Sequence, residues 1–140
     1  MKLSLTAKIV LLLSGSIMTG IGLAVLILPA PFYATNGIAL GADPSLLNEV
    51  RASGGALAGA GGLVLAGLFV SGLARLSMII AAVLYGMYGI SRLFSMALDG
   101  MPADGLTGAA ILELLISALC LFVLVREKAR ARSPLRTANN

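Results

Sequence analysis

The stretch IVLLLSGSIMTGIGLAVLIL, residues 9–28, contains no charged residue and is followed directly by Pro29. An α-helix of this length rises about 30 Å, which is the thickness of the hydrocarbon core of a bilayer. Two lysines precede the stretch, but the apolar run is longer than the ~7–15 residues that are usual in a signal peptide. It therefore predicts a first membrane-spanning helix that is not cleaved.

Three similar segments follow along the chain. Prolines and glycines at 29–45 and 99–105 predict loops, and Arg75 marks a tight turn. The predicted spans are residues 9–28, 46–73, 76–98 and 106–125. We therefore expect an all-α membrane protein, a single four-transmembrane-helix bundle over residues 1–140 whose last part, 126–140, is a basic cytoplasmic tail.

The composition agrees with a lipid environment and argues against an enzyme. Hydrophobic residues make up 59% of the chain and charged residues only 11%, whereas a soluble domain carries about a quarter charged residues. Histidine, the commonest general base and metal ligand, is absent, and Cys120 is the single cysteine. We expect no catalytic residues, no metal site and no cofactor.

The distribution of charges predicts the orientation. With a cytoplasmic N-terminus, eight of the ten lysines and arginines lie inside: Lys2, Lys8, Arg75, Arg126, Lys128, Arg130, Arg132 and Arg136. This is the positive-inside pattern, and an even number of spans places the C-terminus inside as well. The net charge of +4 comes from these flanking bases. We expect the tail to meet anionic lipids and not nucleic acid.

Four ionisable residues lie within the predicted outer halves of the spans: Glu49, Arg51, Arg92 and Glu113. Each such group costs ~2.5–3.5 kcal/mol near the centre of a membrane helix unless it is paired. Their charges sum to zero, so a mutually paired network satisfies them best. We expect Arg92 to pair with Glu113, and Glu49 to pair with either arginine; the spacing does not decide between these.

Helical spacing places further polar residues beside Arg92. Tyr85, Tyr88, Ser95 and Asp99 follow one stripe of the third span at steps of three and four residues. The candidate site residues are Glu49, Arg51, Arg92, Asp99, Glu113, Tyr85 and Tyr88. Two interpretations stay open: an ion-pair network that fixes the bundle, or a site for a ligand or a proton.

The second span is rich in small residues. Arg51, Gly55 and Gly59 align on one face of this helix, and a second row contains Gly54, Ala58, Gly62 and Ala66. Such rows let membrane helices approach closely. We expect these glycines to pack against another helix of the bundle; the alternative is a contact between subunits of a dimer or trimer.

Several short motifs together resemble a known family. They are NEVRASGG at 48–55, GISR at 89–92, the DGMP at 99–102 and the isolated Glu113. From Lys8 to Val125 the chain resembles a bacterial family of short four-helix inner-membrane proteins known only as a domain of unknown function. The resemblance implies the four-helix fold, the charged positions Glu49, Arg51, Arg92, Asp99 and Glu113, and no reaction.

These features favour a non-enzymatic inner-membrane protein that self-associates and binds a lipid or a hydrophobic small molecule. The alternative function is a proton-coupled transporter of amphipathic compounds. Small multidrug exporters have a similar length, but they carry an essential carboxylate in the first helix and tryptophan around it. Here the first predicted span has no acid, and the chain has no tryptophan.

The orientation can be tested with topology reporters. A reporter fused after Asn140 or inserted at Arg75 is expected to report the cytoplasm, and one inserted in the 99–105 loop is expected to report the outside, because basic loops stay inside. A C-terminal fusion that reports the outside would contradict both the number of spans and the orientation.

Overall fold

The computed structural model describes residues 3–137 of the chain, and the side chains of residues 3–130. These residues form four long helices and one short one: α1 (Leu5–Ile27), α2 (Pro29–Ala34), α3 (Pro44–Phe69), α4 (Ala74–Asp99) and α5 (Asp104–Thr137). The four long helices are long and apolar enough to cross a membrane. The predicted all-α, four-helix membrane fold is confirmed.

Local sequence signals account for the helix ends. Asp43 caps α3, because its side chain accepts a hydrogen bond from the backbone nitrogen of Leu46 at 2.8 Å, and Pro44 occupies the first turn. Gly100 ends α4 with a φ of 95°, a conformation that favours glycine. The short helix α2 forms within the first predicted loop. Helix α5 continues beyond its predicted span into the basic tail, as far as Thr137.

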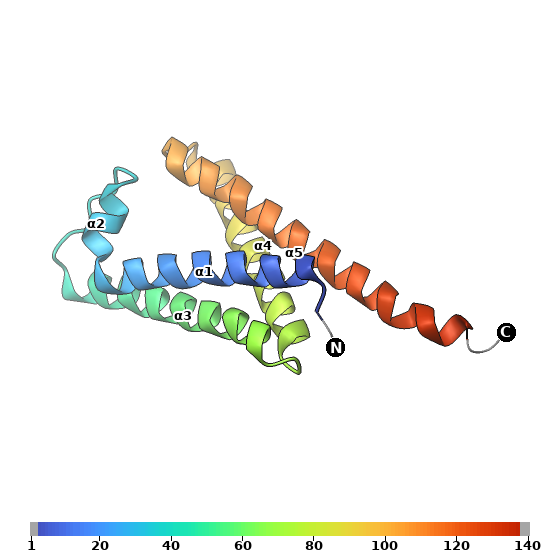
Figure 1. Cartoon of the computed structure of the whole chain (residues 1–140). Coiled ribbons are helices and arrows are strands. Elements are labelled where there is room, and N and C mark those ends of the chain that lie inside the picture. The colour runs from blue at the N-terminus through green and yellow to red at the C-terminus, as the bar shows by residue number, and fades with distance from the viewer. Residues whose placement is uncertain (1–2, 138–140) are drawn as a thin grey trace.

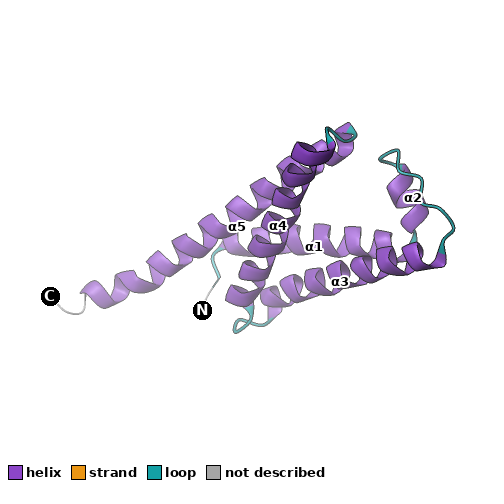
Figure 2. Ribbon diagram, turned by 180° about the vertical axis from the view of Figure 1, so that it is seen from behind, coloured by secondary structure: helices purple, strands orange, loops and turns teal. Residues whose placement is uncertain are grey.

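The long helices are arranged as two pairs. Helix α1 packs along α3, and α4 packs along α5 (Figure 1). The pairs meet near the α3–α4 turn and diverge towards the opposite end, which carries α2 and the loop between α4 and α5 (Figures 1 and 2). We call this the outer end, after its predicted orientation. The fold is therefore a splayed bundle with space between the two pairs at its outer end.

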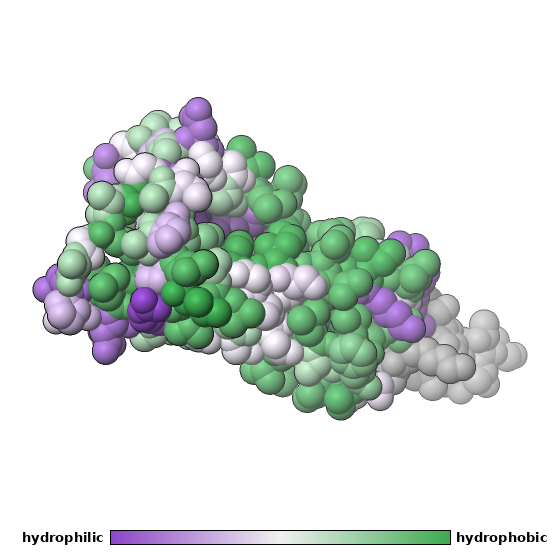
Figure 3. Space-filling model, turned by 60° about the vertical axis from the view of Figure 1, so that its left-hand side comes forward, coloured by the Kyte–Doolittle hydropathy of each residue, from purple (hydrophilic) through white to green (hydrophobic). Residues whose placement is uncertain are grey.

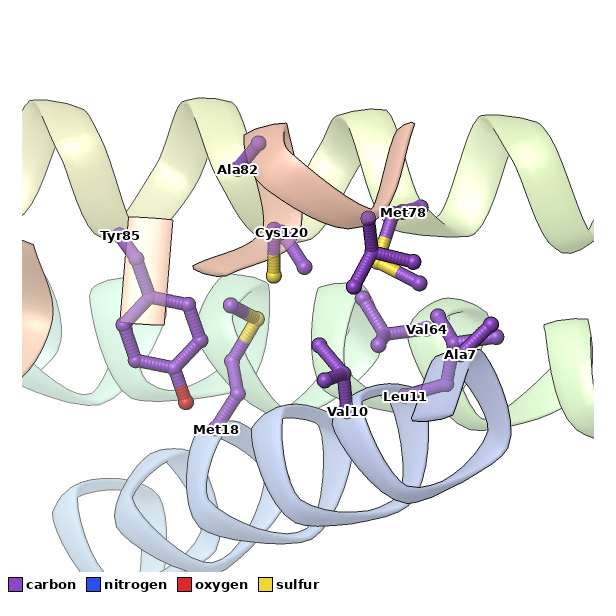
Figure 4. Close-up of a cluster of buried hydrophobic side chains, with 11 residues drawn as sticks. Ala7, Val10, Leu11, Met18, Val64, Met78, Ala82, Tyr85 and Cys120 are labelled. Atoms are coloured by element: carbon purple, nitrogen blue, oxygen red, sulfur yellow. The ribbon is translucent and has the colours of Figure 1, made fainter. Parts of the chain in front are cut away.

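The core fills the region where the pairs meet. Side chains from α1, α3, α4 and α5 converge there, among them Leu11, Val64, Met78 and Cys120 (Figure 4). Tyr85 reaches from α4 towards α1 and lies beside Met18, and its hydroxyl donates a hydrogen bond to the Ser14 carbonyl at 2.8 Å (Figure 4).

Two serines link the other helices through backbone carbonyls. Ser117 of α5 donates to the Ala82 carbonyl of α4 at 2.7 Å, and Ser77 of α4 donates to the Leu63 carbonyl of α3 at 2.8 Å. Interhelical hydrogen bonds of this kind satisfy polar groups that have no water to bind in a bilayer. Together with Tyr85 they join all four long helices.

The outside of the bundle is apolar. Large hydrophobic side chains point away from the protein along the long helices, and the exposed fractions of Leu5 and Val125 are 74% and 69%. Hydrophobic surface covers much of the face drawn in Figure 3. A soluble protein rarely exposes so large a continuous apolar surface, so lipid is the medium that fits it.

Close contact between α1 and α3 depends on glycines. A Cβ atom on Gly54 would lie 2.6 Å from the Leu26 nitrogen and 2.9 Å from the Gly22 carbonyl oxygen. A Cβ atom on Gly61 would lie 2.5 Å from the Thr19 nitrogen. Real Cβ atoms do not approach other atoms so closely, so the two backbones touch only because these positions lack side chains.

The predicted packing role of Gly55, Gly59 and Gly62 within the bundle is wrong. A Cβ on Gly59 or Gly62 would have no neighbouring atom within 4 Å, and one on Gly55 would meet only the Leu26 side chain at 3.9 Å. Helix α3 carries several small-residue rows, and the row that faces α1 contains Gly54 and Gly61. Sequence spacing identifies the rows but does not decide which of them faces α1.

Two alanine substitutions on α3 test this packing. We expect Gly54→Ala to destabilise the protein by about 1–3 kcal/mol, because the added methyl group overlaps the backbone of α1. Gly59→Ala is the matched control, and we expect it to be neutral or to stabilise by up to about 1 kcal/mol through helix propensity. Thermal unfolding in detergent measures both. Equal stability of the two variants would contradict the assigned helix face.

Candidate functional site

A cavity of about 180 Å³ lies between the two helix pairs, on the side where they diverge. Its walls come from all five helices and from the segment that follows α2. The apolar part includes Met18, Ile21 and Val25 of α1 and Leu57 of α3. Protein interiors are close-packed, with few voids larger than a water molecule, so a space of this size is a specific feature of the fold.

One ion pair forms the polar wall of the cavity. The Arg92 Nε atom of α4 donates a hydrogen bond to the Glu113 Oε2 atom of α5 at 2.8 Å, so the predicted pairing of these two residues is present. The exposed fractions of the side chains are 30% for Arg92 and 14% for Glu113. Both residues line the cavity. The pair therefore joins α4 to α5 and also faces an open space.

Arg51 has a different role from the predicted one. Its Nη1 atom donates to the Leu26 carbonyl, and also to the Ile27 carbonyl at 3.2 Å. Both carbonyls belong to the last turn of α1, where backbone oxygens lack intrahelical partners, and the following Pro29 has no N–H group to offer. Arg51 thus caps the C-terminus of α1 and attaches α1 to α3. Its positive charge also interacts favourably with the negative C-terminal end of the α1 dipole.

The predicted four-residue network is therefore wrong in part. Glu49 lies on the exposed face of α3, and among residues 3–130 it forms no ion pair with either arginine. The reason is geometric: Arg51 turns towards the end of α1, and Arg92 lies on another helix pair. Asp99 lies at the exposed end of α4 and accepts a hydrogen bond from Ser95 at 2.9 Å. Of the four charges within the spans, only Arg92 and Glu113 come together.

The two tyrosines of the predicted stripe both reach the cavity. Tyr85 is buried at its inner end, and Tyr88 is 39% exposed. Tyr85, Tyr88 and Arg92 lie on successive turns of α4, so the spacing that predicted a polar stripe predicted part of the cavity wall. The last two residues of the stripe, Ser95 and Asp99, are exposed and do not line the cavity.

Other wall residues come from the segment that was expected only to be a loop. Phe32 and Tyr33 of α2 line the cavity, and their rings are in edge contact with centroids 5.8 Å apart. Asn36 follows α2 and lies against the first turn of α5, where its Oδ1 atom would be 2.5 Å from a Cβ on Gly105. The prolines and glycines of this segment predicted a loop, but nothing local predicted that it would fold against the other helix pair.

The described residues contain no metal site. Nowhere among them do three or more cysteine, aspartate or glutamate side chains converge closely enough to hold a metal ion. The chemistry that the site offers is one cation, one carboxylate, phenolic hydroxyls and an apolar wall. This set suits the binding of an amphipathic molecule.

The fold and the site define a multi-pass α-helical membrane protein with one ion pair at an internal cavity. The chain belongs to the family DUF4345, a domain of unknown function, whose model matches residues 6–124. The resemblance to an uncharacterised family is thus confirmed. No curated protein and no solved structure matches the chain.

The ion pair can be tested by a double-mutant cycle. Arg92→Met or Glu113→Leu alone is expected to destabilise the protein by about 3 kcal/mol, because each leaves an unpaired charge in a poorly solvated place. The double variant is expected to lose less than half of the summed losses of the two single variants, since neither charge remains. Thermal unfolding in detergent measures all three variants. Strict additivity would mean that the two residues are not partners.

Proposed function

We propose that this protein is a non-enzymatic membrane protein that binds a lipid or an amphipathic small molecule in the cavity between its helix pairs. The observation that carries the proposal is the position of the Arg92–Glu113 pair in the wall of an otherwise largely apolar cavity. Ligand sites in proteins combine mostly apolar walls with a few placed polar groups, and this cavity has that composition.

The size of the cavity supports the binding of a small apolar body. An apolar cavity of about 150 Å³ in another protein is large enough to bind benzene. The cavity here, at about 180 Å³, accommodates one aromatic ring or a short segment of an acyl chain. A larger ligand would extend from it between the diverging helix pairs.

The open surroundings of the ion pair favour a binding site over a purely structural role. A structural pair between two packed helices is best enclosed on all sides, because low dielectric strengthens it and neighbouring groups satisfy its remaining atoms. Arg92 and Glu113 instead border an open space, with Tyr88 beside them. Tyrosine supplies a rigid ring and a hydroxyl, which suits recognition of a molecule with apolar and polar parts.

A proton-coupled transporter of amphipathic compounds is the second candidate function. The observation that favours it is that Glu113 lies within a predicted span and borders the cavity. Transport requires this carboxylate to take up and release a proton, so Glu113→Gln is expected to abolish it. A binding role without transport predicts no movement of compound or protons across proteoliposomes that contain the protein.

The proposal also covers the oligomeric state of the protein and the membrane in which it resides. We propose a homo-oligomer, a dimer or trimer, in the bacterial inner membrane. The free small-residue face of α3 at Gly59 and Gly62 supports the first point, because it can approach a second copy closely. The basic residues around one end of the bundle support the second, since they match the positive-inside pattern of cytoplasmic membranes.

Native mass spectrometry of the protein extracted from its membrane tests the binding function. The wild type is expected to carry a lipid or small-molecule adduct. Ala109→Phe is expected to reduce the adduct at least tenfold, because Ala109 lines the cavity and a phenyl ring would fill it. Ala118→Phe is the matched control on an exposed position of α5 and is expected to keep the adduct.

Two outcomes would contradict the proposed function. An adduct that survives in Ala109→Phe would mean that the ligand binds elsewhere. A wild type that carries no adduct, and whose melting temperature does not rise with any added lipid extract, would mean that the cavity is not a binding site.

A further inference from the structure

We propose, on the basis of the binding function above, that the ligand is an uncharged amphiphile whose polar group both donates and accepts hydrogen bonds. A hydroxyl group is the simplest group of this kind. The inference comes from the hydrogen-bonding capacity that the Arg92–Glu113 pair leaves unused and from its net charge of zero.

The ion pair uses only part of what its two side chains offer. Arg92 has five N–H donors, and among residues 3–130 only its Nε–H makes a hydrogen bond. The four N–H groups on its two Nη atoms make none in this part of the chain. Glu113 accepts through Oε2, and its Oε1 atom likewise has no hydrogen-bond partner there. The pair therefore offers both free donors and a free acceptor.

These unused atoms are accessible. Within the same residues, the side-chain nitrogen and oxygen atoms that are buried without a hydrogen bond are Thr19 Oγ1 and Glu127 Oε1. The Nη atoms of Arg92 and the Oε1 atom of Glu113 are not among them, so protein atoms do not seal them. Since both residues line the cavity, a ligand there can reach both.

The charge balance decides which polar group fits. Arg92 and Glu113 neutralise each other across 2.8 Å. A ligand carboxylate on Arg92 would place a second anion near Glu113, and a ligand ammonium on Glu113 would place a second cation near Arg92. Either would leave one net charge in a medium of low dielectric, which is unfavourable. A hydroxyl adds no charge, accepts from Arg92 and donates to Glu113.

The apolar part of such a ligand has a suitable wall. Met18, Ile21 and Val25 lie on the α1 side of the cavity, and Tyr85 closes its inner end. The volume of about 180 Å³ matches one ring-sized body. Benzyl alcohol is a small compound with both proposed features, an aromatic ring and a hydroxyl group. Benzoate and benzylammonium are its anionic and cationic counterparts.

Thermal unfolding in detergent with these three compounds at pH 7 tests the inference. Benzyl alcohol is expected to raise the melting temperature of the wild type, relative to that of Ala109→Phe, by about 3 °C or more at saturation. Benzoate and benzylammonium are expected to change this difference by less than about 1 °C. The comparison with a cavity-filled variant removes effects of the compounds on the micelle.

The Arg92→Met, Glu113→Leu double variant supplies the second comparison, and it is expected to lose the preference for the alcohol. A larger effect of benzoate or benzylammonium, dependent on Arg92 and Glu113, would overturn the inference and leave the binding function standing. Equal effects of all three compounds on every variant, or no effect, would overturn it as well. The adduct in native mass spectrometry then decides the binding function separately.

Discussion

A bilayer offers no water to the polar groups of a membrane-spanning helix, and this constraint governs the whole structure. Backbone groups are satisfied within the helices, and the side-chain hydrogen bonds that cross between helices go mainly to backbone carbonyls. Tyr85, Ser77 and Ser117 each join one helix to another in this way. The Arg92–Glu113 pair is the charged counterpart of these contacts. Its position at a cavity sets it apart, because ionisable residues within membrane spans that face a cavity often mark a site for a ligand or an ion.

The two helix pairs have different kinds of interface, and the difference creates the site. Helices α1 and α3 touch backbone to backbone at Gly22, Gly54 and Gly61, which leaves no space between them. The two pairs meet through larger side chains such as Tyr85 and Met18 (Figure 4), and only over part of their length (Figure 1). A tight pair and a looser junction between pairs together produce a bundle that is closed at one end and open at the other.

The fold and one half of the charged site follow from the sequence. Hydropathy and length determine the spans, and the i, i+3 and i, i+4 spacing from Tyr85 to Arg92 places these residues on one face of α4. Glu113 lies in the outer half of the next predicted span, as Arg92 does in its own, so their pairing was predictable, whereas the partner of Glu49 was left open. The role of Arg51 was not, because it depends on where α1 ends and on the orientation of α3 against it. The same holds for Asn36, which reaches α5 only through the tertiary fold.

The cap on α1 has a consequence for biosynthesis. The carbonyls that end α1 receive their hydrogen bonds from Arg51, which lies 24 residues later in the chain than Ile27. In a nascent chain that has inserted only α1, the carbonyls at the end of this span thus lack their hydrogen-bond donor, and Arg51 has not yet found its acceptors. Insertion of α1 and α3 as a hairpin resolves both needs at once, since the arginine reaches its acceptors as the second helix enters. We therefore expect the first two membrane spans to insert as one unit, before the α4–α5 pair joins them.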